Sequence, residues 1–515
     1  MSEHTSANLF KLFRSRFPKD RASLFLRTND DNRYSYDDLE NFSSRYAHVL
    51  TDRGLKPGDR VATQIEKSPE AVFLYLACLK AGGVFLPLNT AYQADELEYF
   101  LDDAEPSIVV GDSRRKDLAG LCAARSKTVY VTLDADGSGT LPNASAEKPS
   151  QFQCVDRSES DLAAILYSSG TTGRPKGVML SHANLAANAS ALHEVWGFAK
   201  DDILLHALPI FHTHGLFVAI NTVLLNGTGM IFHNKFNADA VAGDLPDATV
   251  FMGVPTYYVR LLSCDTFTRD SCRNIRLFLC GSAPLLDETF KQFEGRTGKQ
   301  IVERYGMTEA GIITSADPRK PRKAGDVGWP LPGVSLRIAG ENNQDLAPGE
   351  TGEILIRGPG LFSGYWRKPE KTAEEFTAGG YFKTGDLAQL DENGMVAIVG
   401  RAKDMIISGG FNVYPKEIEA IVDGLPAVDE SAVVGMPHPD FGEAGMAVIT
   451  LLTGEEFDES AAKQILKKEL ANYKVPKFFV IADELPRNAM GKVQKNVLRE
   501  RFQADWNAHL KTSTA

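Results

Sequence analysis

Short apolar segments alternate with amphipathic helical patterns over about the first 400 of the 515 residues, and this alternation limits the chain to a few architectures. Residues 60–64 and 249–252 are apolar runs of strand length, and helical patterns follow them at residues 68–81 and 255–262. Strands joined by helices usually pair in parallel, because the helix returns the chain to the end of the sheet at which the first strand began. The sequence therefore predicts a layered α/β architecture with largely parallel sheets.

The pattern changes twice in the rest of the chain. From about residue 335, shorter strands bounded by Gly, Pro and Asp predict a small antiparallel barrel or sheet; they lie at residues 334–339, 352–357 and 395–399. After Gly400, helices alternate with strands in the manner of an α+β domain; the helices are expected at residues 416–422, 461–470 and 495–502, and the strands at residues 428–434 and 447–452. We therefore predict an N-terminal region at residues 1–400 and a smaller domain at residues 401–515, with a hinge near residues 401–404.

Composition argues against several classes of protein. The net charge of -11 does not favour a dedicated nucleic-acid surface. No segment reaches the roughly 18–20 apolar residues that a membrane span needs. The six cysteines form no C-x-x-C pair, which indicates reduced thiols in a reducing compartment. The basic residues of the N-terminus, such as Lys11 and Arg14, would fit a mitochondrial transit peptide, but apolar residues such as Phe10 and Phe13 favour a first amphipathic helix. The cytosol is therefore expected, with the mitochondrion as the alternative.

The segment from Ala164 to Gly177 is the most informative part of the sequence, because it leads from an apolar strand through a loop of hydroxyls and glycines to Lys176. Its donors are Ser168, Ser169, Gly170, Thr171, Thr172 and Gly173. Glycines let backbone N–H groups approach an anion closely, and a lysine can follow the β and γ phosphates of a nucleotide. The Walker pattern is not met, because Lys176 precedes Gly177 and no hydroxyl follows it. We predict a phosphate-binding loop of a different kind.

This segment resembles the phosphate loop Y-T-S-G-T-T-G-x-P-K-G of the adenylate-forming superfamily, which includes acyl-CoA synthetases, carrier-loading adenylation domains and luciferases. Only Ser168 departs from that pattern, and it keeps the hydroxyl. Other motifs of the superfamily follow in the family order along nearly the whole chain, and the likeness is greatest to malonyl-CoA synthetases. The resemblance implies a multi-part N-terminal region followed by a mobile C-terminal domain.

The resemblance also implies a nucleotide site. Tyr305 opens a Y-G-x-T-E motif, in which Thr308 would contact the α-phosphate and Glu309 would help to hold Mg²⁺, a hard cation that prefers carboxylate oxygen. Asp386 and Arg401 would bind the ribose hydroxyls. The other nucleotide residues implied are Gly281, Ser282 and Ala283 in an adenine-binding turn, and Glu303 and Arg304 beside Tyr305.

Three features of the C-terminal domain match the family. Lys492, in an L-P-x-x-x-x-G-K element, would neutralise the charge that develops during adenylation. Gly409 and Gly410 would line the tunnel for the pantetheine arm of coenzyme A. Lys403 would be the hinge about which the domain rotates between the two half-reactions.

The segment that contains His212 and His214 has two interpretations. His-x-His on a strand can hold a catalytic metal, but no further ligand cluster follows at a suitable spacing. By resemblance, His212 corresponds to a histidine that gates the acyl pocket, while His214 is a second pocket residue or a buried core residue. A dicarboxylate would need a cation for its second charge, and we predict Arg260 for this role.

The function implied is an ATP-dependent acid–thiol ligase that makes malonyl-CoA from the free acid through an acyl-adenylate, with release of AMP and pyrophosphate. Methylmalonate is a natural second substrate, because one extra methyl group is hard to exclude. ATP, Mg²⁺ and coenzyme A are the expected cofactor and co-substrates, and neither nucleic acid nor membrane insertion is expected. The alternatives are a ligase for another small or aromatic acid, a free-standing carrier-loading enzyme, and a binding protein that kept the fold without activity.

Overall fold

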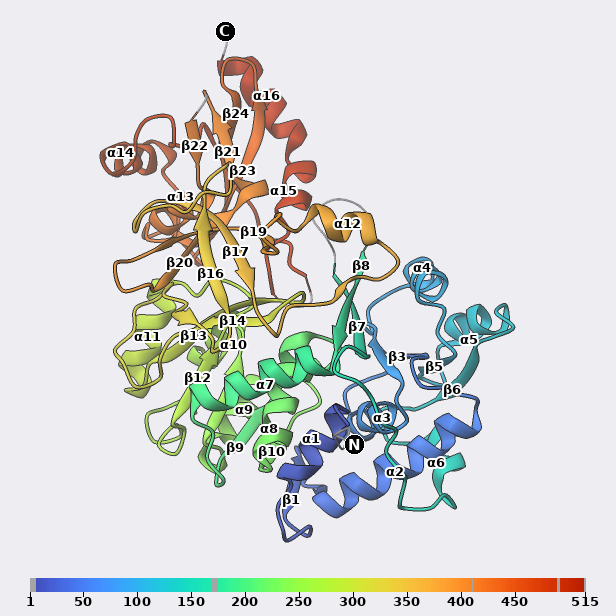
Figure 1. Ribbon diagram of the computed structural model, residues 1–515. Helices are drawn as coiled ribbons and strands as arrows, with labels where there is room; N and C mark the ends of the chain where they lie inside the picture. Colours follow the sequence, from blue (N-terminus) through green and yellow to red (C-terminus); the bar gives the residue numbers. More distant parts are fainter. Residues whose placement is uncertain (1–5, 169–174, 410, 489–490, 514–515) are drawn as a thin grey trace.

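The computed structural model describes residues 6–168, 175–409, 411–488 and 491–513, which form four sheets (Figure 1). The first sheet has the order β18-β8-β7-β4-β3-β5-β6 and is parallel from β7 to β6. Its strands are β3 (Arg60–Gln64), β4 (Val84–Pro87), β5 (Ile108–Gly111), β6 (Val129–Thr132), β7 (Leu162–Ser168), β8 (Lys176–Ser181) and β18 (Gly364–Tyr365). The antiparallel edge, β7–β8–β18, carries the predicted phosphate loop.

The second sheet has the order β15-β14-β13-β12-β11-β9-β10-β1-β2, and its central strands from β1 to β13 run parallel. Its strands are β1 (Leu24–Thr28), β2 (Arg33–Ser35), β9 (Ile203–His206), β10 (Gly229–Phe232), β11 (Val250–Gly253), β12 (Leu277–Cys280), β13 (Ile301–Met307), β14 (Gly311–Ser315) and β15 (Trp329–Pro330). The layered α/β architecture with largely parallel sheets is thereby confirmed.

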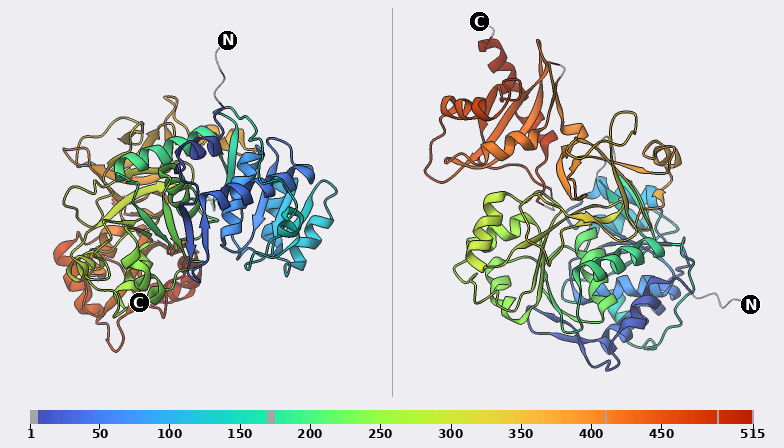
Figure 2. Two further views of the ribbon diagram at one scale, coloured as in Figure 1. Left: turned by 90° about the horizontal axis from the view of Figure 1, so that it is seen from below. Right: turned by 60° about the vertical axis from the view of Figure 1, so that its left-hand side comes forward.

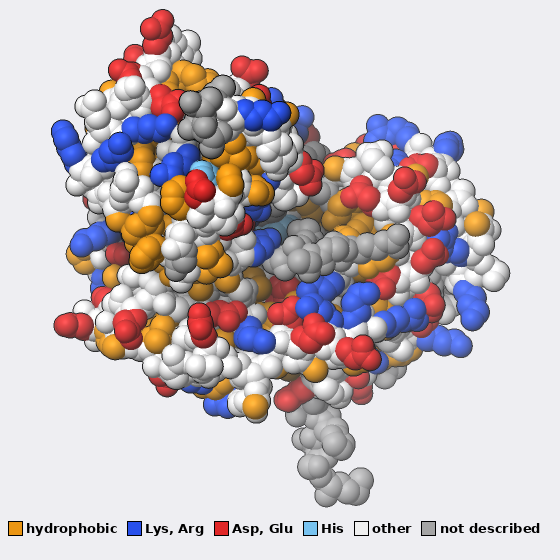
Figure 3. Space-filling view, turned by 90° about the horizontal axis from the view of Figure 1, so that it is seen from above, with side chains coloured by type: hydrophobic (Ala, Val, Ile, Leu, Met, Phe, Trp, Pro, Cys, Tyr) orange, Lys and Arg blue, Asp and Glu red, His pale blue; other side chains and the backbone are white. Residues whose placement is uncertain are grey.

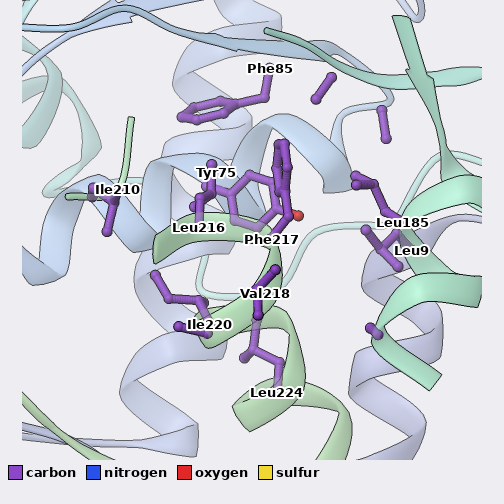
Figure 4. Close-up of a cluster of buried hydrophobic side chains, with 14 of the residues drawn as sticks. Leu9, Tyr75, Phe85, Leu185, Ile210, Leu216, Phe217, Val218, Ile220 and Leu224 are labelled. Atoms are coloured by element: carbon purple, nitrogen blue, oxygen red, sulfur yellow. The ribbon is translucent and has the colours of Figure 1, made fainter. Parts of the chain in front are cut away.

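A shared layer of helices separates the two large sheets and forms the main core. It contains α1 (Leu9–Arg16), α2 (Tyr36–Asp52), α3 (Pro69–Lys80), α7 (His182–Trp196), the π-helix η1 (His214–Ile220) and α8 (Asn221–Asn226). Helix α3 is buried all round because both sheets and neighbouring helices cover it, and Figure 4 shows Tyr75 of α3 packed among η1 side chains such as Phe217. This core fixes the loops that leave both sheets.

Other helices cover the outer faces of the sheets. A second cluster packs α9 (Ala238–Asp244), η2 (Leu245–Asp247), α10 (Pro255–Leu262) and α11 (Asp287–Thr297) against the second sheet. A third packs α4 (Ala94–Ala104) and α5 (Lys116–Ala123) against the first sheet, and the short α6 (Thr140–Ser145) contacts α2. No helix in the described part of the chain is long and apolar enough to cross a membrane.

The third sheet, β16-β17-β19-β20, is antiparallel and lies between these layers and the C-terminal domain (Figure 1). Its strands are β16 (Ser335–Ala339), β17 (Gly352–Arg357), β19 (Phe382–Leu390) and β20 (Val396–Arg401), and α12 (Pro369–Glu374) lies between β18 and β19 along the chain. The small antiparallel sheet expected from residue 335 is confirmed.

The C-terminal domain holds the fourth sheet and appears as a separate unit in the right-hand view of Figure 2. Its strands are β21 (Ile406–Ser408), β22 (Phe411–Val413), β23 (Val428–His438), β24 (Gly442–Leu451) and β25 (Phe478–Ile481). Its helices are α13 (Pro415–Val422), α14 (Glu459–Glu469), α15 (Lys495–Arg501) and α16 (Gln503–Ser513), and the short η3 (Ala402–Asp404) precedes β21. The predicted hinge residue Lys403 lies in η3; rotation about it stays a prediction.

Gly328 joins the second and third sheets at a point where no side chain fits. Its φ is +80°, and a Cβ atom there would lie 1.9 Å from the carbonyl oxygen of Ser315 at the end of β14. The carbonyl of Gly328 accepts a hydrogen bond from the N–H of Val396, the first residue of β20. The backbone at Gly328 therefore fixes how β20 meets the larger sheet.

We expect Gly328→Ala to lower the free energy of unfolding by about 3 kcal/mol or more, because backbone strain and a backbone clash add together. Gly349→Ala is the matched control: Gly349 has a φ of +85° but open space around the Cβ position, so the loss should be about 1 kcal/mol. Thermal unfolding of both variants beside the wild type measures the difference. Equal losses would contradict the close approach at Gly328.

Candidate active site

The predicted phosphate loop connects two antiparallel strands that place its ends side by side. Ser168 closes β7 and Lys176 opens β8, and the two residues are register partners. The predictions for Ser169, Gly170, Thr171, Thr172 and Gly173 fall outside the described residues. The ammonium of Lys176 lies 4.2 Å from the centre of the Tyr365 ring and 3.7 Å from Oε1 of Glu375.

Glu309 lies beside Ser168, at the start of this loop. Its side chain is 6% exposed, and its Oε1 accepts hydrogen bonds from the hydroxyls of Ser168 and Tyr365, both at 3.2 Å. Burial raises the pKa of Glu309, while those hydroxyls and the nearby Lys176 oppose that shift. Thr308, next to Glu309, lines a small cavity with Thr213 and Phe217.

Asp386 gathers a second group of predicted residues on the third sheet. It is buried on β19 opposite Arg401 of β20, and the Nε of Arg401 lies 3.0 Å from its Oδ1. The hydroxyl of Tyr305 donates to its Oδ2 at 2.7 Å. The structure thus brings three predicted nucleotide residues together. Tyr305 is 81 positions from Asp386 along the chain, and Arg401 lies on the strand next to Asp386.

Lys492 reaches this group from the C-terminal domain. Burial lowers its pKa to about 8, Arg401 adds to the shift, and Asp386 opposes it. The loop that carries Lys492 is closed by hydrogen bonds between the backbone of Lys492 and Asn488. At Gly491, which has a φ of +74°, the loop approaches Thr256 at the start of α10. The predicted adenylation lysine therefore lies at the contact between the two parts of the chain.

The predicted adenine turn covers a buried arginine. At Gly281, a Cβ atom would lie 2.7 Å from Cζ of Arg304, so only glycine leaves room for the guanidinium. The next residue, Ser282, has a φ of +73°, an unusual conformation for a residue with a side chain. Its hydroxyl lies 3.4 Å from Nδ1 of His214. Ala283 follows in the same turn, which lies between β12 and α11.

Arg304 is buried and incompletely paired. Its side chain is 4% exposed, and its Nε and Nη2 are buried with no hydrogen-bond partner among the described residues. Burial lowers its pKa to about 10, so the group remains a cation at neutral pH. Burial and the charge of Arg304 together lower the pKa of His212 to about 4, and they also lower that of His214. A cation with free donors therefore faces two neutral imidazoles.

The segment with His212 and His214 is a helical turn, not the strand that the metal interpretation required. His214 opens the π-helix η1, and its backbone N–H donates to Nδ1 of His212 at 3.3 Å. No group of three or more His, Cys, Asp or Glu side chains suited to a metal occurs in the described parts of the chain. His214 is buried at 2% exposure beside Ser282, which fits both a pocket residue and a buried core residue.

Three other predicted residues lie outside the groups around Glu309, Asp386 and Arg304, and a fourth is not among the described residues. Arg260 is exposed in the last turn of α10, and no hydrogen bond or ion pair between described residues holds its guanidinium. Gly409, with a φ of +59°, turns between β21 and β22, and its N–H donates to the carbonyl of Phe441. Gly410 lies outside the described residues. Glu303 accepts a hydrogen bond from the N–H of Gly325 at 2.7 Å and faces Lys416 of the C-terminal domain.

Seen from the side of the C-terminal domain, the surface is hollowed between that domain and the lobe that carries α4 and α5 (Figure 3).

A family model for AMP-binding enzymes matches residues 10–366, and one for the AMP-binding enzyme C-terminal domain matches residues 417–492. The chain belongs to the AMP-binding enzyme family.

Relatives of this AMP-binding enzyme agree with that assignment. The feruloyl-CoA synthase of Amycolatopsis sp is 36% identical over 473 residues, which cover 91% of this chain and 94% of the relative. The mitochondrial malonate–CoA ligase of Bos taurus is 34% identical over 509 residues, which cover 90% and 86%. The crystal structure of ATP-bound MatB from Rhodopseudomonas palustris is 50% identical, has a TM-score of 0.94, and covers 97% of this chain and 99% of that chain.

The structure is more similar to the ATP-bound form of MatB than to its apo form. The apo crystal structure of the same MatB has the same identity and coverage, but its TM-score is 0.85.

Sequence reasoning missed two residues that the structure places at the site. Tyr365 contacts both Lys176 and Glu309, and Lys416 joins the two parts of the chain: its Nζ donates to the carbonyl of Ile398 on β20 at 2.8 Å and faces Glu303. The aromatic pair Tyr365-Trp366 before a proline was the available signal for the first. Lys416 had none, because a lysine in the first turn of a helix is usually solvated.

We expect Lys416→Met to loosen the contact between the C-terminal domain and the third sheet, because Glu303 would stay buried without its nearby cation. Hydrogen exchange should accelerate at residues 396–401 and 411–417. Lys463→Met is the matched control, since Lys463 also donates to a backbone carbonyl, that of Lys477, but within one domain. Unchanged exchange at residues 396–401 in Lys416→Met would contradict this role.

Proposed function

We propose that this enzyme joins malonate to coenzyme A through a malonyl-adenylate, at the expense of ATP and with release of AMP and pyrophosphate. The observation that carries the proposal is the side of the Arg304 guanidinium that bears Nε and Nη2, because these atoms have no hydrogen-bond partner among the described residues. Nε and Nη2 are the two donors on one side of a guanidinium, and that side binds a carboxylate in bidentate fashion. The second carboxylate of malonate would supply the missing partner.

Relatives named malonate–CoA ligases in Bos taurus, Mus musculus, Homo sapiens and Arabidopsis thaliana support this choice of acid. An aromatic-acid ligase is the second candidate, because the feruloyl-CoA synthase is slightly more identical to this chain than they are. A flat apolar acid would leave the buried donors of Arg304 unpaired, and this would cost free energy on binding. The pocket geometry therefore favours the dicarboxylate.

In the first half-reaction, a carboxylate oxygen of malonate attacks the α-phosphorus of ATP, and pyrophosphate leaves. Thr308 would contact the α-phosphate, and Lys492, beside Asp386 and Arg401, would neutralise the charge that develops there. Lys176 would follow the β and γ phosphates. Asp386 and Arg401 would hold the ribose, and the turn that contains Gly281 and Ala283 would contact the adenine.

Glu309 fits a role beside a magnesium ion. It is a buried carboxylate whose Oε1 accepts hydrogen bonds from the hydroxyls of Ser168 and Tyr365, and a carboxylate can supply a hard oxygen ligand. No complete set of protein ligands exists among the described residues, so phosphate oxygens and water would supply the other ligands. When bound, the ion would neutralise phosphate charge.

In the second half-reaction, the thiolate of coenzyme A attacks the carbonyl carbon of the malonyl-adenylate and expels AMP. Lys492 would leave the site and Gly409 and Gly410 would approach it when the C-terminal domain turns about Lys403. His212, neutral at physiological pH, would gate the acid pocket. The cytosol is the proposed compartment, supported by six free cysteines, five of them buried.

We expect Arg304→Met to lower kcat/KM for malonate about 100-fold, because a buried carboxylate would lose its cation. Arg260→Met should change it less than about threefold, since Arg260 is exposed. The rate of AMP release with malonate, acetate and ferulate gives kcat/KM for both variants and the wild type. If Arg260→Met alone removes malonate activity, the carboxylate binds at α10 as the sequence predicted. If neither variant loses malonate activity, the dicarboxylate proposal is wrong.

We expect Lys492→Met to slow malonyl-adenylate formation at least about 100-fold and to leave thioester formation from synthetic malonyl-adenylate nearly unchanged, because its charge would act only in the first half-reaction. ATP–pyrophosphate exchange and a thiol-trapping assay measure the two steps separately. Lys467→Met, which removes an exposed lysine of the same domain, should affect neither. Equal losses in both steps would show that Lys492 acts on the structure of the domain.

A further inference from the structure

Tyr365 is fixed in place by the elements around it. It lies on β18, is 4% exposed, and pairs with Val178 on β8, two residues beyond Lys176. Its backbone N–H donates to Oγ1 of Thr372, and its ring packs edge-on against Phe362 at 4.9 Å. The side chain therefore has little freedom to move.

Two different parts of this side chain contact the two charged residues of the phosphate site. The hydroxyl donates to Oε1 of Glu309 at 3.2 Å, and the ring face lies 4.2 Å from the ammonium of Lys176. The same segment also holds the backbone of Glu309, because the N–H of Phe362 donates to its carbonyl at 2.7 Å. One rigid segment thus supports both charges.

This arrangement holds the two charges without neutralising either. No ion pair joins Lys176 to Glu309 among the residues that the structure describes, although Lys176 is near enough to lower the pKa of Glu309. A direct ion pair would engage the groups with each other and compete with phosphate and metal. An uncharged phenol attracts an ammonium through its ring face and donates to a carboxylate, so both keep their charge.

The other contact of Lys176 is of a different kind. Glu375 lies 3.7 Å from its ammonium but also 3.4 Å from that of Lys371, and its side chain is 27% exposed. Glu375 is shared with Lys371, and a triphosphate would compete with Glu375 for Lys176. The contact with the Tyr365 ring is uncharged, so phosphate binding does not oppose it.

We propose that Tyr365 is a positioning residue for the adenylation step: its hydroxyl orients Glu309 toward the magnesium ion and its ring face holds Lys176 in reach of the phosphates. The proposal rests on the roles given to Lys176 and Glu309 in the proposed function. It separates into two parts, because one oxygen atom serves Glu309 and the ring serves Lys176.

Calorimetric titration of ATP into the full-length protein, with Mg²⁺ or with EDTA, tests each part. We expect Tyr365→Phe to bind ATP in EDTA within about twofold of wild type but to lose about tenfold of the gain in affinity that Mg²⁺ gives. Tyr365→Leu should also bind ATP about tenfold more weakly in EDTA, because it lacks the ring. Thioester formation from synthetic malonyl-adenylate should stay at the wild-type rate in both.

Tyr36→Phe is the matched control, since Tyr36 is fully buried and donates one hydrogen bond, to the carbonyl of Thr228, far along the chain from the phosphate loop. It should change melting temperature without changing either affinity. If Tyr365→Leu does not fold, Tyr365→Phe, which lacks a single oxygen, decides the part that concerns Glu309, and Tyr365→Met replaces Tyr365→Leu for the ring, since the flexible Met side chain fills irregular space.

The proposal is overturned if Tyr365→Phe keeps the full effect of Mg²⁺, or if its affinity falls equally with Mg²⁺ and with EDTA. Glu309→Gln and Lys176→Met distinguish this failure from a failure of the proposed function. Wild-type binding by those two variants would remove the roles on which the proposal rests. Losses in them, without a loss in Tyr365→Phe, would reject the role of Tyr365 alone.

Discussion

Asp386 is the residue at which separate parts of the site meet, and the arrangement around it depends on keeping a buried carboxylate paired. Tyr305 comes from the second sheet, Arg401 from the neighbouring strand of the third sheet, and Lys492 from the C-terminal domain. A buried charge that lost these neighbours would be strongly unfavourable. The pairing of Asp386 therefore links the position of the C-terminal domain to the predicted ribose site.

The same logic applies to the contact between Glu303 and Lys416. Burial raises the pKa of Glu303 to about 7 and lowers that of Lys416, and each opposes the shift of the other. If the C-terminal domain turns between half-reactions, Lys416 must leave Glu303 and the carbonyl of Ile398 at the same time as Lys492 leaves Asp386. Two charged contacts would then break together, which favours a change between discrete orientations over gradual motion.

The sequence predicted the local structure well where local signals are strong. The strand at residues 60–64 and the helix at residues 255–262 have the expected bounds, because apolar runs and the proline at the start of α10 specify them. The motif residue Glu309 lies beside Ser168 of the predicted phosphate loop, and Asp386 lies beside Arg401. What sequence could not show is long-range: Tyr365 lies 189 positions from the lysine beneath which it packs. Arg260 was chosen for its residue type, but only the fold shows that it is exposed and that Arg304 is enclosed.

Arg304 shows how selectivity can arise from an unfavourable feature of the free protein. Its burial beneath Gly281 leaves two donors without a partner among the residues that the structure describes. Desolvation lowers its pKa only to about 10, so the group keeps its charge at neutral pH. Unpaired buried donors cost free energy, and an acid with a second carboxylate would remove this cost by pairing with them. An acid without one would exclude water from the donors and leave them unpaired. Sites that pair a buried polar group with the substrate reject analogues that lack the partner far more strongly than apolar pockets reject a missing methyl group. The same physics predicts weak discrimination between malonate and methylmalonate, since both offer the carboxylate and differ by one methyl group.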